Sequence, residues 1–402
     1  MTPFRPLSLS ILSLALGAAL CAPAQAQSLL ALVESARTYD TAWQSARAQL
    51  DAAARKADQA RAGLLPSAAL TGGLTRSNVE LSKPKIENTG TAQTVGINAS
   101  QPLYRPANRI TLEQGQRGVE VAQAQLDAAT QDLLVRVSQA YFDVLAAQDT
   151  LTFVQAQKAA VSEQLAAAKR NFEVGTATVT DSREAQARYD LVIAQEIAAE
   201  NDLRVKRLAL DQLVGITGTK PQPLALPVQL PSVVPDNLTT WVDTARDQQP
   251  GVRQAAIALD IARLETKKAE TGHLPTVDLQ AGYNVTRNLH GTITSPGVTA
   301  RSNAASVGVA LNLPLFAGFA VQNRVKETLA LETKAEADLE TARRNVAQAT
   351  RAAFYGVQSG QGQVQALEAA EASSQSALDA NKLGYQVGVR INIDVLNAQS
   401  QL

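Results

Sequence analysis

The sequence of 402 residues has a single cysteine, Cys21, and only 4% aromatic residues. One cysteine excludes an intrachain disulfide framework and any cluster of thiolates. Basic and acidic residues number 37 each, so the charge balance gives no indication of nucleic acid or of a strongly acidic partner. Beyond the first 26 residues no window of 18 uncharged apolar residues occurs, so no transmembrane helix is predicted.

Reactive clusters are also missing. The two histidines, His273 and His290, have no second pair of metal-ligating residues close in sequence, so a metal site is not indicated. No Ser-His-Asp arrangement, phosphate loop or dinucleotide fingerprint is present. Paired carboxylates occur only on heptad-like helices, where they usually form a solvated face. We therefore expect neither an enzyme nor a cofactor.

The N-terminus has the features of an export signal. A basic residue, an apolar run and the sequence Ala-Gln-Ala precede Gln27, which predicts a signal peptide over residues 1–26. Cys21 raises the alternative of a lipoprotein, but Leu20 stands where a small residue is expected. An exported chain without a transmembrane helix is either soluble or crosses an outer membrane by strands.

Four short segments alternate between apolar side chains and small or polar ones, which is typical of strands with one apolar face. They lie at 67–75, 93–103, 275–287 and 304–315. Between the first two, Ser77, Asn78, Lys83, Pro84 and Asn88 predict an exposed loop. In water the apolar face would pack on a core, and no other element offers one. In an outer membrane it would face lipid, with the polar face lining water.

The remaining chain has helical periodicity. Helices are predicted over 28–62 and 238–270, and a continuous helix over 108–172, roughly 100 Å long at about 1.5 Å per residue. Residues 107–220 contain no proline, and a second helix is predicted to return over 182–214. The long helix carries a coiled-coil-like apolar seam at Leu126, Leu133, Val137, Val144, Leu151 and Val154.

The two halves repeat each other. Gly175 and Gly388 are 213 residues apart, and so are Asp181 and Asp394, which indicates an internal duplication. The predicted organisation is a signal peptide at 1–26, a first repeat at 27–214 with its hairpin tip at 173–181, a proline-rich linker at 215–238, and a second repeat at 239–402 with its tip at 385–394. The last helix is expected to be shorter than its counterpart at 182–214, so we expect the sequence to be a fragment of a longer chain.

Each hairpin tip contains a glycine followed by polar residues. Gly175 and Gly388 are expected to take the left-handed conformation that ends a helix. Asn392 or Asp394 can cap the helix that follows the second tip, and Asp181 stands at the equivalent point of the first.

Four strands cannot close a barrel around water, and open sheet edges are not tolerated in lipid. Several copies of the chain must therefore share one barrel. Periodicity demands an oligomer but does not fix the number of copies.

Three segments resemble the TolC family of outer-membrane channel-tunnels. They are Gly-His-Leu-Pro-Thr-Val-Asp-Leu at 272–279, Ala-Tyr-Phe-Asp-Val-Leu at 140–145, and Tyr385-x-Val-Gly388-x-Arg390-x-x-x-Asp394-Val-Leu at 385–396. The resemblance covers essentially the whole mature chain. It implies a mainly α fold with a membrane β-barrel portion: a homotrimer with a shared twelve-stranded barrel in the outer membrane, long helical hairpins forming a periplasmic tunnel, and a belt at 215–238.

The same resemblance implies a function. Family members are passive exit ducts for type I protein secretion and for multidrug efflux, and they work with a periplasmic adaptor and an inner-membrane pump of the ABC or RND type. The alternative is a periplasmic coiled-coil scaffold without a channel. The strand alternation argues against a scaffold, which has no use for strands that face lipid.

The resemblance also assigns site residues. Tyr385 and Arg390 match residues that tie the inner hairpin to its neighbours, and Thr180 and Asp181 match their partners on the other hairpin. Packing alone for Tyr385 and a solvated charge for Arg390 are the simpler alternatives.

Asp394 matches the aspartate that forms a ring across the pore entrance, and helix capping is its simpler role. The best-known family member has a second aspartate where this chain has Asn397, so the ring would carry one carboxylate per subunit and a weaker attraction for cations. Tyr104, Phe316 and Phe319 flank strand ends, where they would form an interfacial aromatic girdle or pack in a core.

Overall fold

The computed structural model describes residues 27–402 except 84, 226–227, 229 and 293–294. The predicted signal peptide, Pro84 and Pro227 lie outside the described residues. The chain divides into two compact units, which are treated separately. The sheet unit comprises residues 46–128 and 241–349, and the tip unit comprises residues up to 45 together with 129–240 and 350–402.

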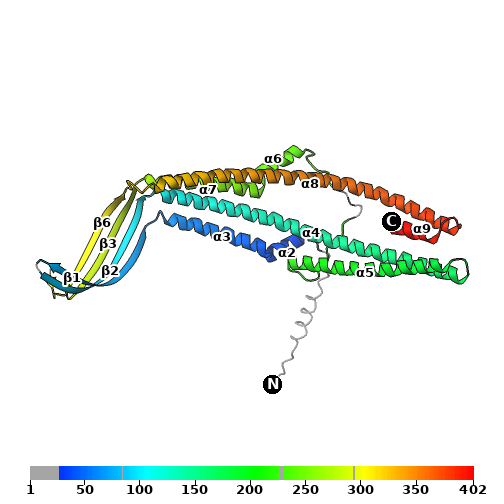
Figure 1. The fold of residues 1–402 in the computed structure, drawn as a ribbon, viewed down its shortest axis with the longest axis horizontal. Coiled ribbons are helices and arrows are strands. Elements are labelled where there is room, and N and C mark those ends of the chain that lie inside the picture. The colour runs from blue at the N-terminus through cyan, green and yellow to red at the C-terminus, as the bar shows by residue number, and fades with distance from the viewer. Residues whose placement is uncertain (1–26, 84, 226–227, 229, 293–294) are drawn as a thin grey trace, which may run out of the picture. The chain divides into compact units, whose positions relative to one another are not determined.

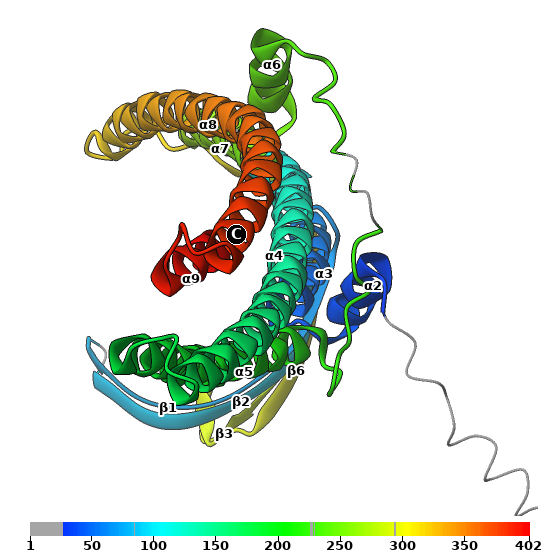
Figure 2. The same cartoon turned by 90° about the vertical axis from the view of Figure 1, so that its right-hand side faces the viewer.

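The sheet unit contains an antiparallel sheet in the order β1-β2-β3-β6, with β1 and β6 at its edges (Figure 1). Its strands are β1 (Ser67–Ser82), β2 (Lys85–Tyr104), β3 (Thr276–Leu289) and β6 (Ala300–Asn312). Two short strands, β4 (Gly291–Thr292) and β5 (Ser295–Pro296), pair with each other between β3 and β6 in the chain. Figure 2 shows β1 and β2 curving in the same sense.

Strand register gathers the predicted apolar residues on one face of the sheet. Leu70 lies opposite Ile97, and Ile97 lies opposite Tyr283. Directly paired residues share a face, so the apolar positions of all four strands line up. The face is uncovered in the single chain, since the exposed fractions of Leu70 and Val307 are 74% and 79%.

Two strand predictions need correction. The exposed loop predicted between 75 and 93 is wrong, because β1 continues to Ser82 and β2 begins at Lys85. Ladder hydrogen bonds come from the main chain and tolerate polar residues, and Thr89 Oγ1 also donates to Asn78 Oδ1 at 3.0 Å. The last strand ends at Asn312 rather than 315, since Pro314 has no N–H for the ladder.

Two helices predicted as continuous are each broken once. Residues 28–62 form α2 (Leu29–Tyr39) and α3 (Thr41–Ala62), and residues 238–270 form α6 (Leu238–Gln248) and α7 (Pro250–Glu270), which is followed by the short turn η1 (Thr271–His273). Asp40 restarts the first helix by accepting a hydrogen bond from the Trp43 N–H at 2.7 Å. Pro250 restarts the second, because proline suits the first helical position.

The predicted long helices are present. They are α4 (Pro106–Glu173), α5 (Val179–Val214), α8 (Ala320–Gln386) and the shorter α9 (Asn392–Gln401). None of the helices in the described residues has the length and hydropathy of a membrane-spanning segment.

In the tip unit, the predicted seam of α4 becomes its core. Leu133, Val137 and Val144 are fully buried against residues of α2 and α5, including Leu32 and Leu210. On the part of α8 that belongs to this unit, Val357 and Leu367 are 50% and 61% exposed in the single chain. An apolar stripe of this kind on a long helix is expected to meet another helix.

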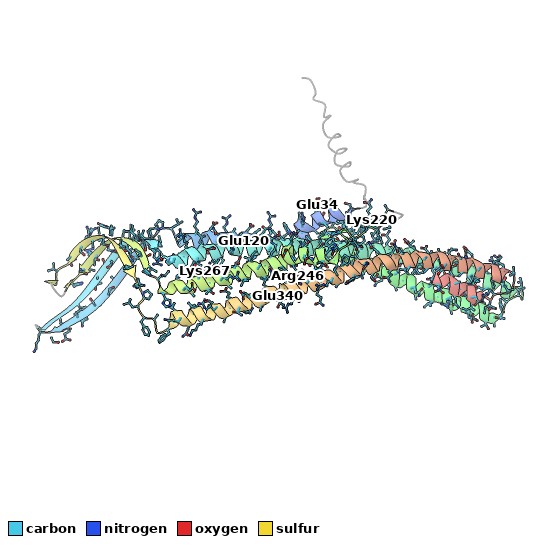
Figure 3. The ribbon with its side chains drawn as sticks, turned by 90° about the horizontal axis from the view of Figure 1, so that it is seen from above. Glu34, Glu120, Lys220, Arg246, Lys267 and Glu340 are labelled. Atoms are coloured by element: carbon cyan, nitrogen blue, oxygen red, sulfur yellow. The ribbon has the colours of Figure 1, made fainter. Side chains whose placement is uncertain are left out.

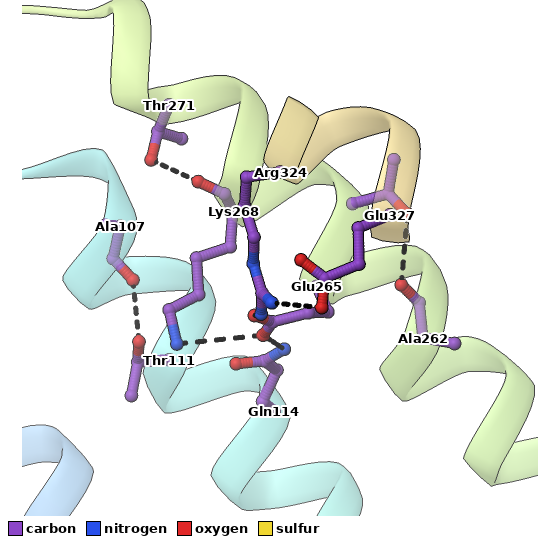
Figure 4. Close-up of polar contacts among 10 residues, drawn as sticks. Ala107, Thr111, Gln114, Ala262, Glu265, Lys268, Thr271, Arg324 and Glu327 are labelled. Carbon is purple, nitrogen blue, oxygen red and sulfur yellow. Dashed lines mark hydrogen bonds and ion pairs between the residues drawn. The ribbon is translucent and has the colours of Figure 1, made fainter. Parts of the chain in front are cut away.

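A polar network joins three helices of the sheet unit around Glu265 (Figure 4). Gln114 of α4 donates to Glu265 Oε2 at 2.9 Å, and Arg324 of α8 donates to Oε1 at 2.7 Å. Burial alone would raise the pKa of Glu265, but these two hydrogen bonds and the nearby Lys268 hold the pKa below its usual value. The carboxylate therefore stays charged and keeps the three helices together.

Other charged side chains of the helices are exposed to solvent. Glu120, Arg246, Lys267 and Glu340 are examples (Figure 3), as the prediction of solvated helix faces requires. The exposed Tyr104, Phe316 and Phe319, at 46%, 75% and 62%, favour the aromatic girdle over core packing.

The proline-rich segment after α5 is fastened by backbone and side-chain bonds within the tip unit. Gln27 forms a β-bridge with Pro221, and the Tyr141 hydroxyl donates to the Gln222 carbonyl at 2.6 Å. Further along, Gln361 of α8 donates to the Pro231 carbonyl at 2.8 Å. These bonds fasten the described part of the segment at Pro221, Gln222 and Pro231, and its role as a belt stays a prediction.

Asp40 generates a testable pH dependence. The hydrogen bond from Arg136 Nη1 to Asp40 Oδ2, 2.9 Å long, holds the pKa of Asp40 below its usual value although burial opposes it. A carboxylate whose folded pKa is depressed stabilises the protein above its unfolded pKa of about 3.9, and that stabilisation is lost as the pH falls through the folded pKa. The protection factors of amides 41–44, which are their intrinsic exchange rates divided by the observed rates at the same pH, should therefore fall below about pH 4.

Two substitutions check the cause. Asp40→Asn keeps a capping side chain and should remove the acid dependence, whereas Asp40→Ala should also cost about 1 kcal/mol of local stability. Asp132→Asn is the control, because Asp132 pairs with the same Arg136 but is 63% exposed, and it should have a smaller effect. Equal exchange in Asp40→Ala and the unmodified protein would contradict this role.

Candidate functional site

The first hairpin tip joins α4 to α5 by a tight turn. Gly175 has a φ of 80°, the left-handed conformation that the sequence predicts. The Asn171 carbonyl accepts hydrogen bonds from the N–H groups of Thr176 and Ala177 at 2.8 and 3.1 Å. Helix α5 then begins with a capping box, in which the side chains of Thr178 and Asp181 each bond to the other residue's N–H.

The second tip, between α8 and α9, has the same turn with equivalent backbone hydrogen bonds. Gly388 also has a φ of 80°. The Gly384 carbonyl, equivalent to that of Asn171, accepts from the N–H groups of Val389 and Arg390 at 2.9 and 3.1 Å. The two tips are therefore structural copies, and residue pairs 213 positions apart can be compared directly.

The copies differ at the start of the following helix. The N-cap residue of α9 is Ile391, which makes no side-chain cap bond, where the first tip has Thr178. Neither Asn392 nor Asp394 occupies the capping position, so the prediction that one of them caps α9 is wrong. The restart falls one residue before Asn392 and leaves Asp394 in the first turn of the helix.

Because Asp394 makes no cap, its carboxylate is available for another interaction. Arg390 Nη1 lies 3.7 Å from Asp394 Oδ2, with the two side chains 58% and 34% exposed. A Cβ atom at position 384 would lie 2.7 Å from Arg390 Cγ, so Gly384 leaves the room in which the Arg390 side chain lies. The absence of a side chain at position 384 thus permits the Arg390 side chain to lie close to the backbone of α8.

Arg390, Asp394 and Asn397 line one polar groove of 460 Å³ between α8 and α9, together with Ser373, Ser374, Ala377, Asn381, Ala398 and Gln401. Tyr385, Thr180 and Asp181 do not line it. In the described part of the chain no three His, Cys, Asp or Glu side chains gather as a metal site. The groove offers one carboxylate and one guanidinium to a solute.

Among the described residues, side-chain hydrogen bonds join the hairpins at two places within one chain. Asn171 Nδ2 donates to the Tyr385 hydroxyl at 3.3 Å, and Arg188 Nη2 donates to Asn397 Oδ1 at 2.9 Å. Sequence reasoning missed Asn171 and Arg188. The 213-residue offset could have pointed to Asn171, since it is the counterpart of Gly384, but no pattern in the sequence marks Arg188 among the arginines of α5.

Comparison with known proteins supports the resemblance. The family model described as "Outer membrane efflux protein" matches residues 32–216 and 241–402. The chain is 34% identical to the outer membrane protein TolC of Vibrio cholerae, covering 94% of this chain and 85% of that protein. It is 30% identical to the proteases secretion protein PrtF of Dickeya chrysanthemi, covering 94% and 83%.

Among solved structures, the outer membrane protein VceC of Vibrio cholerae is similar, with a TM-score of 0.77 over 93% of this chain and 89% of that chain, at 20% identity. The matches confirm the predicted fold class, the outer-membrane location and the role of exit duct for secretion and efflux. The chain belongs to the outer membrane efflux protein family, the family that includes TolC.

Proposed function

We propose that the hairpin tips are the gate of this outer-membrane duct, closed by polar ties between hairpins and opened when a partner breaks them. One observation carries the proposal: the uncapped second tip directs Asp394 to Arg390, while Tyr385 of the same tip bonds to Asn171 of the other hairpin. Weak polar ties between packed helices give two states of similar free energy, which a bound partner can shift.

The functional unit is a homotrimer. The sheet has an uncovered apolar face and two edge strands, β1 and β6, and lipid tolerates no unpaired edge. Joining β6 of one copy to β1 of the next pairs every edge, and three copies make a closed barrel of twelve strands. The exposed seam of α8 at Val357 and Leu367 would be covered by a neighbouring copy in the same assembly.

Three copies would place three Asp394 carboxylates around the entrance. A ring of carboxylates in a narrow opening attracts cations and repels anions, and Asn397 adds no charge to it. Thr180 and Asp181 of a neighbouring copy are the proposed further partners of Tyr385 and Arg390, since within one chain Asp181 serves its own capping box.

The duct is passive and has no catalytic role. A periplasmic adaptor and an inner-membrane pump of the ABC or RND type supply the energy and select the cargo. The name of PrtF, a protein of protease secretion, favours a type I secretion system among the uses of such a duct. A periplasmic scaffold is less well supported, because it gives no role to the apolar face of the sheet.

Loss of the ties should open the duct. Tyr385→Phe combined with Arg390→Ser removes the hydroxyl from Asn171 and the guanidinium from Asp394, so single-channel conductance in planar bilayers should rise. Lys382→Ser is the matched control: it removes one positive charge from the exposed end of α8 and should leave conductance nearly unchanged. Equal conductance of the double variant and the unmodified trimer would refute the assigned ties.

The proposed ring of Asp394 carboxylates can be tested separately through the ion selectivity of the channel. Asp394→Ala should lower the cation-to-anion permeability ratio, measured from reversal potentials in a salt gradient, because it removes the only proposed carboxylate of the ring. Glu184→Ala, at the position of the first hairpin that corresponds to Asn397, is the control and should change the ratio little. Persistent selectivity in Asp394→Ala would place the selecting charge elsewhere.

Adjacent residues of β6 test which face meets lipid. Val307→Arg puts a charge on the apolar face and should cost about 2–4 kcal/mol near the bilayer midplane, reducing the yield of outer-membrane trimer. Ser306→Arg puts the same charge on the opposite face and should be tolerated. Equal trimer yields from the two variants would mean that the apolar face does not contact lipid.

A further inference from the structure

The contact between α5 and α9 fixes two side chains opposite each other. Leu396 of α9 is buried against Val192 of α5, and Tyr189 and Ile393 pack at the edge of the same cluster. Arg188 precedes Tyr189 and Asn397 follows Leu396, so apolar packing sets the position of both. Their bond of 2.9 Å between Arg188 Nη2 and Asn397 Oδ1 is therefore made between two anchored backbones.

Arg188 brings a charge that its partner does not neutralise. Asn397 is neutral, and among the described residues no carboxylate lies within ion-pairing distance of Arg188. Asn397 is three residues after Asp394, which places the two on neighbouring positions of one helix face. The Arg188 guanidinium thus lies within about one helical turn of the proposed ring carboxylate.

We infer that Arg188 is a positioning residue of the gate, which ties α5 to α9 through Asn397 and partly offsets the charge of Asp394 at the entrance. This inference rests on the proposed gate. It assigns the tie to one chain, so it holds the two hairpins of a subunit together whether or not the neighbouring subunits are bound to each other. It also gives position 397 a role: a neutral acceptor for Arg188.

The tie and the charge can be separated by substitution. Arg188→Gln should raise the ratio of open to closed channel about fivefold, the size expected for the net contribution of one solvent-exposed hydrogen bond. It should also raise the cation-to-anion permeability ratio. Arg188→Lys keeps the charge, so it should restore selectivity while restoring closure only in part.

The reciprocal change is Asn397→Asp. A carboxylate facing Arg188 forms an ion pair, so closure should strengthen by about twofold. Because that carboxylate takes up the charge that offsets Asp394, the cation-to-anion permeability ratio should rise about as much as in Arg188→Gln. In an Arg188→Gln background the same substitution adds an unpaired charge and should clearly raise cation selectivity. Arg183→Gln is the matched control, since Arg183 is exposed on another part of α5 and should alter neither closure nor the response to Asn397→Asp.

A cross-link tests the placement independently of conductance. The sequence has no cysteine after Cys21, so Arg188→Cys with Asn397→Cys introduces a unique pair for a short bismaleimide. An intrachain cross-link that also lowers conductance is the expected result. Failure to cross-link within one chain would overturn the placement of α9 against α5.

The outcomes also separate this inference from the gate itself. If the cross-link forms but Arg188→Gln leaves closure and selectivity unchanged, Arg188 is only structural, and the gate proposal still stands on Tyr385 and Arg390. If the variant with Tyr385→Phe and Arg390→Ser also leaves conductance unchanged, the gate proposal fails and the inference fails with it.

Discussion

The register of one antiparallel sheet constrains the whole molecule. Main-chain hydrogen bonds place Leu70, Ile97 and Tyr283 in one row, and the neighbouring rows bring the other apolar side chains to the same face. A slip of one residue would turn every one of them to the opposite side. Since no described part of the chain covers this face, we infer that lipid does so, and a lipid environment in turn requires that the edges of the sheet be paired.

In the tip unit, the proposed gate depends on a difference between two turns that are otherwise alike. Each tip has a glycine in the left-handed conformation, and in each an equivalent carbonyl, that of Asn171 or Gly384, accepts two hydrogen bonds. The first has Thr178 and binds Asp181 in a capping box, whereas the second has Ile391 and leaves Asp394 to Arg390. The two tips therefore differ because threonine is the N-cap residue of the first and isoleucine that of the second. The first tip is stabilised by its own side chains, whereas the charged residues of the second are available to partners.

Much of this could be predicted from the sequence, because the signals are periodic. Alternation over a few residues located the four strands, and the uninterrupted seam from Leu133 to Val144 located the core of the tip unit. Boundaries were less predictable. Polar residues such as Asn78 suggested a loop although the ladder continues through them, and Asp40 gave no sign that its side chain would end one helix and start the next.

The site could be predicted only in part. The offset between the repeats pointed to Gly175, Gly388, Asp181 and Asp394, but it also implied that Asp394 caps a helix as Asp181 supports one. The bonds of Asn171 to Tyr385 and of Arg188 to Asn397 depend on how two hairpins pack, which no local pattern encodes. Such contacts follow from tertiary structure and must be read from it.

The proposed assembly requires that the sheet lie in the lipid bilayer and that other copies of the chain complete the barrel. The most direct measurement is the solubility and mass of the purified mature protein with and without detergent. We expect a trimer that remains in solution only with detergent or lipid. A stable monomer that is fully soluble in plain buffer would contradict it.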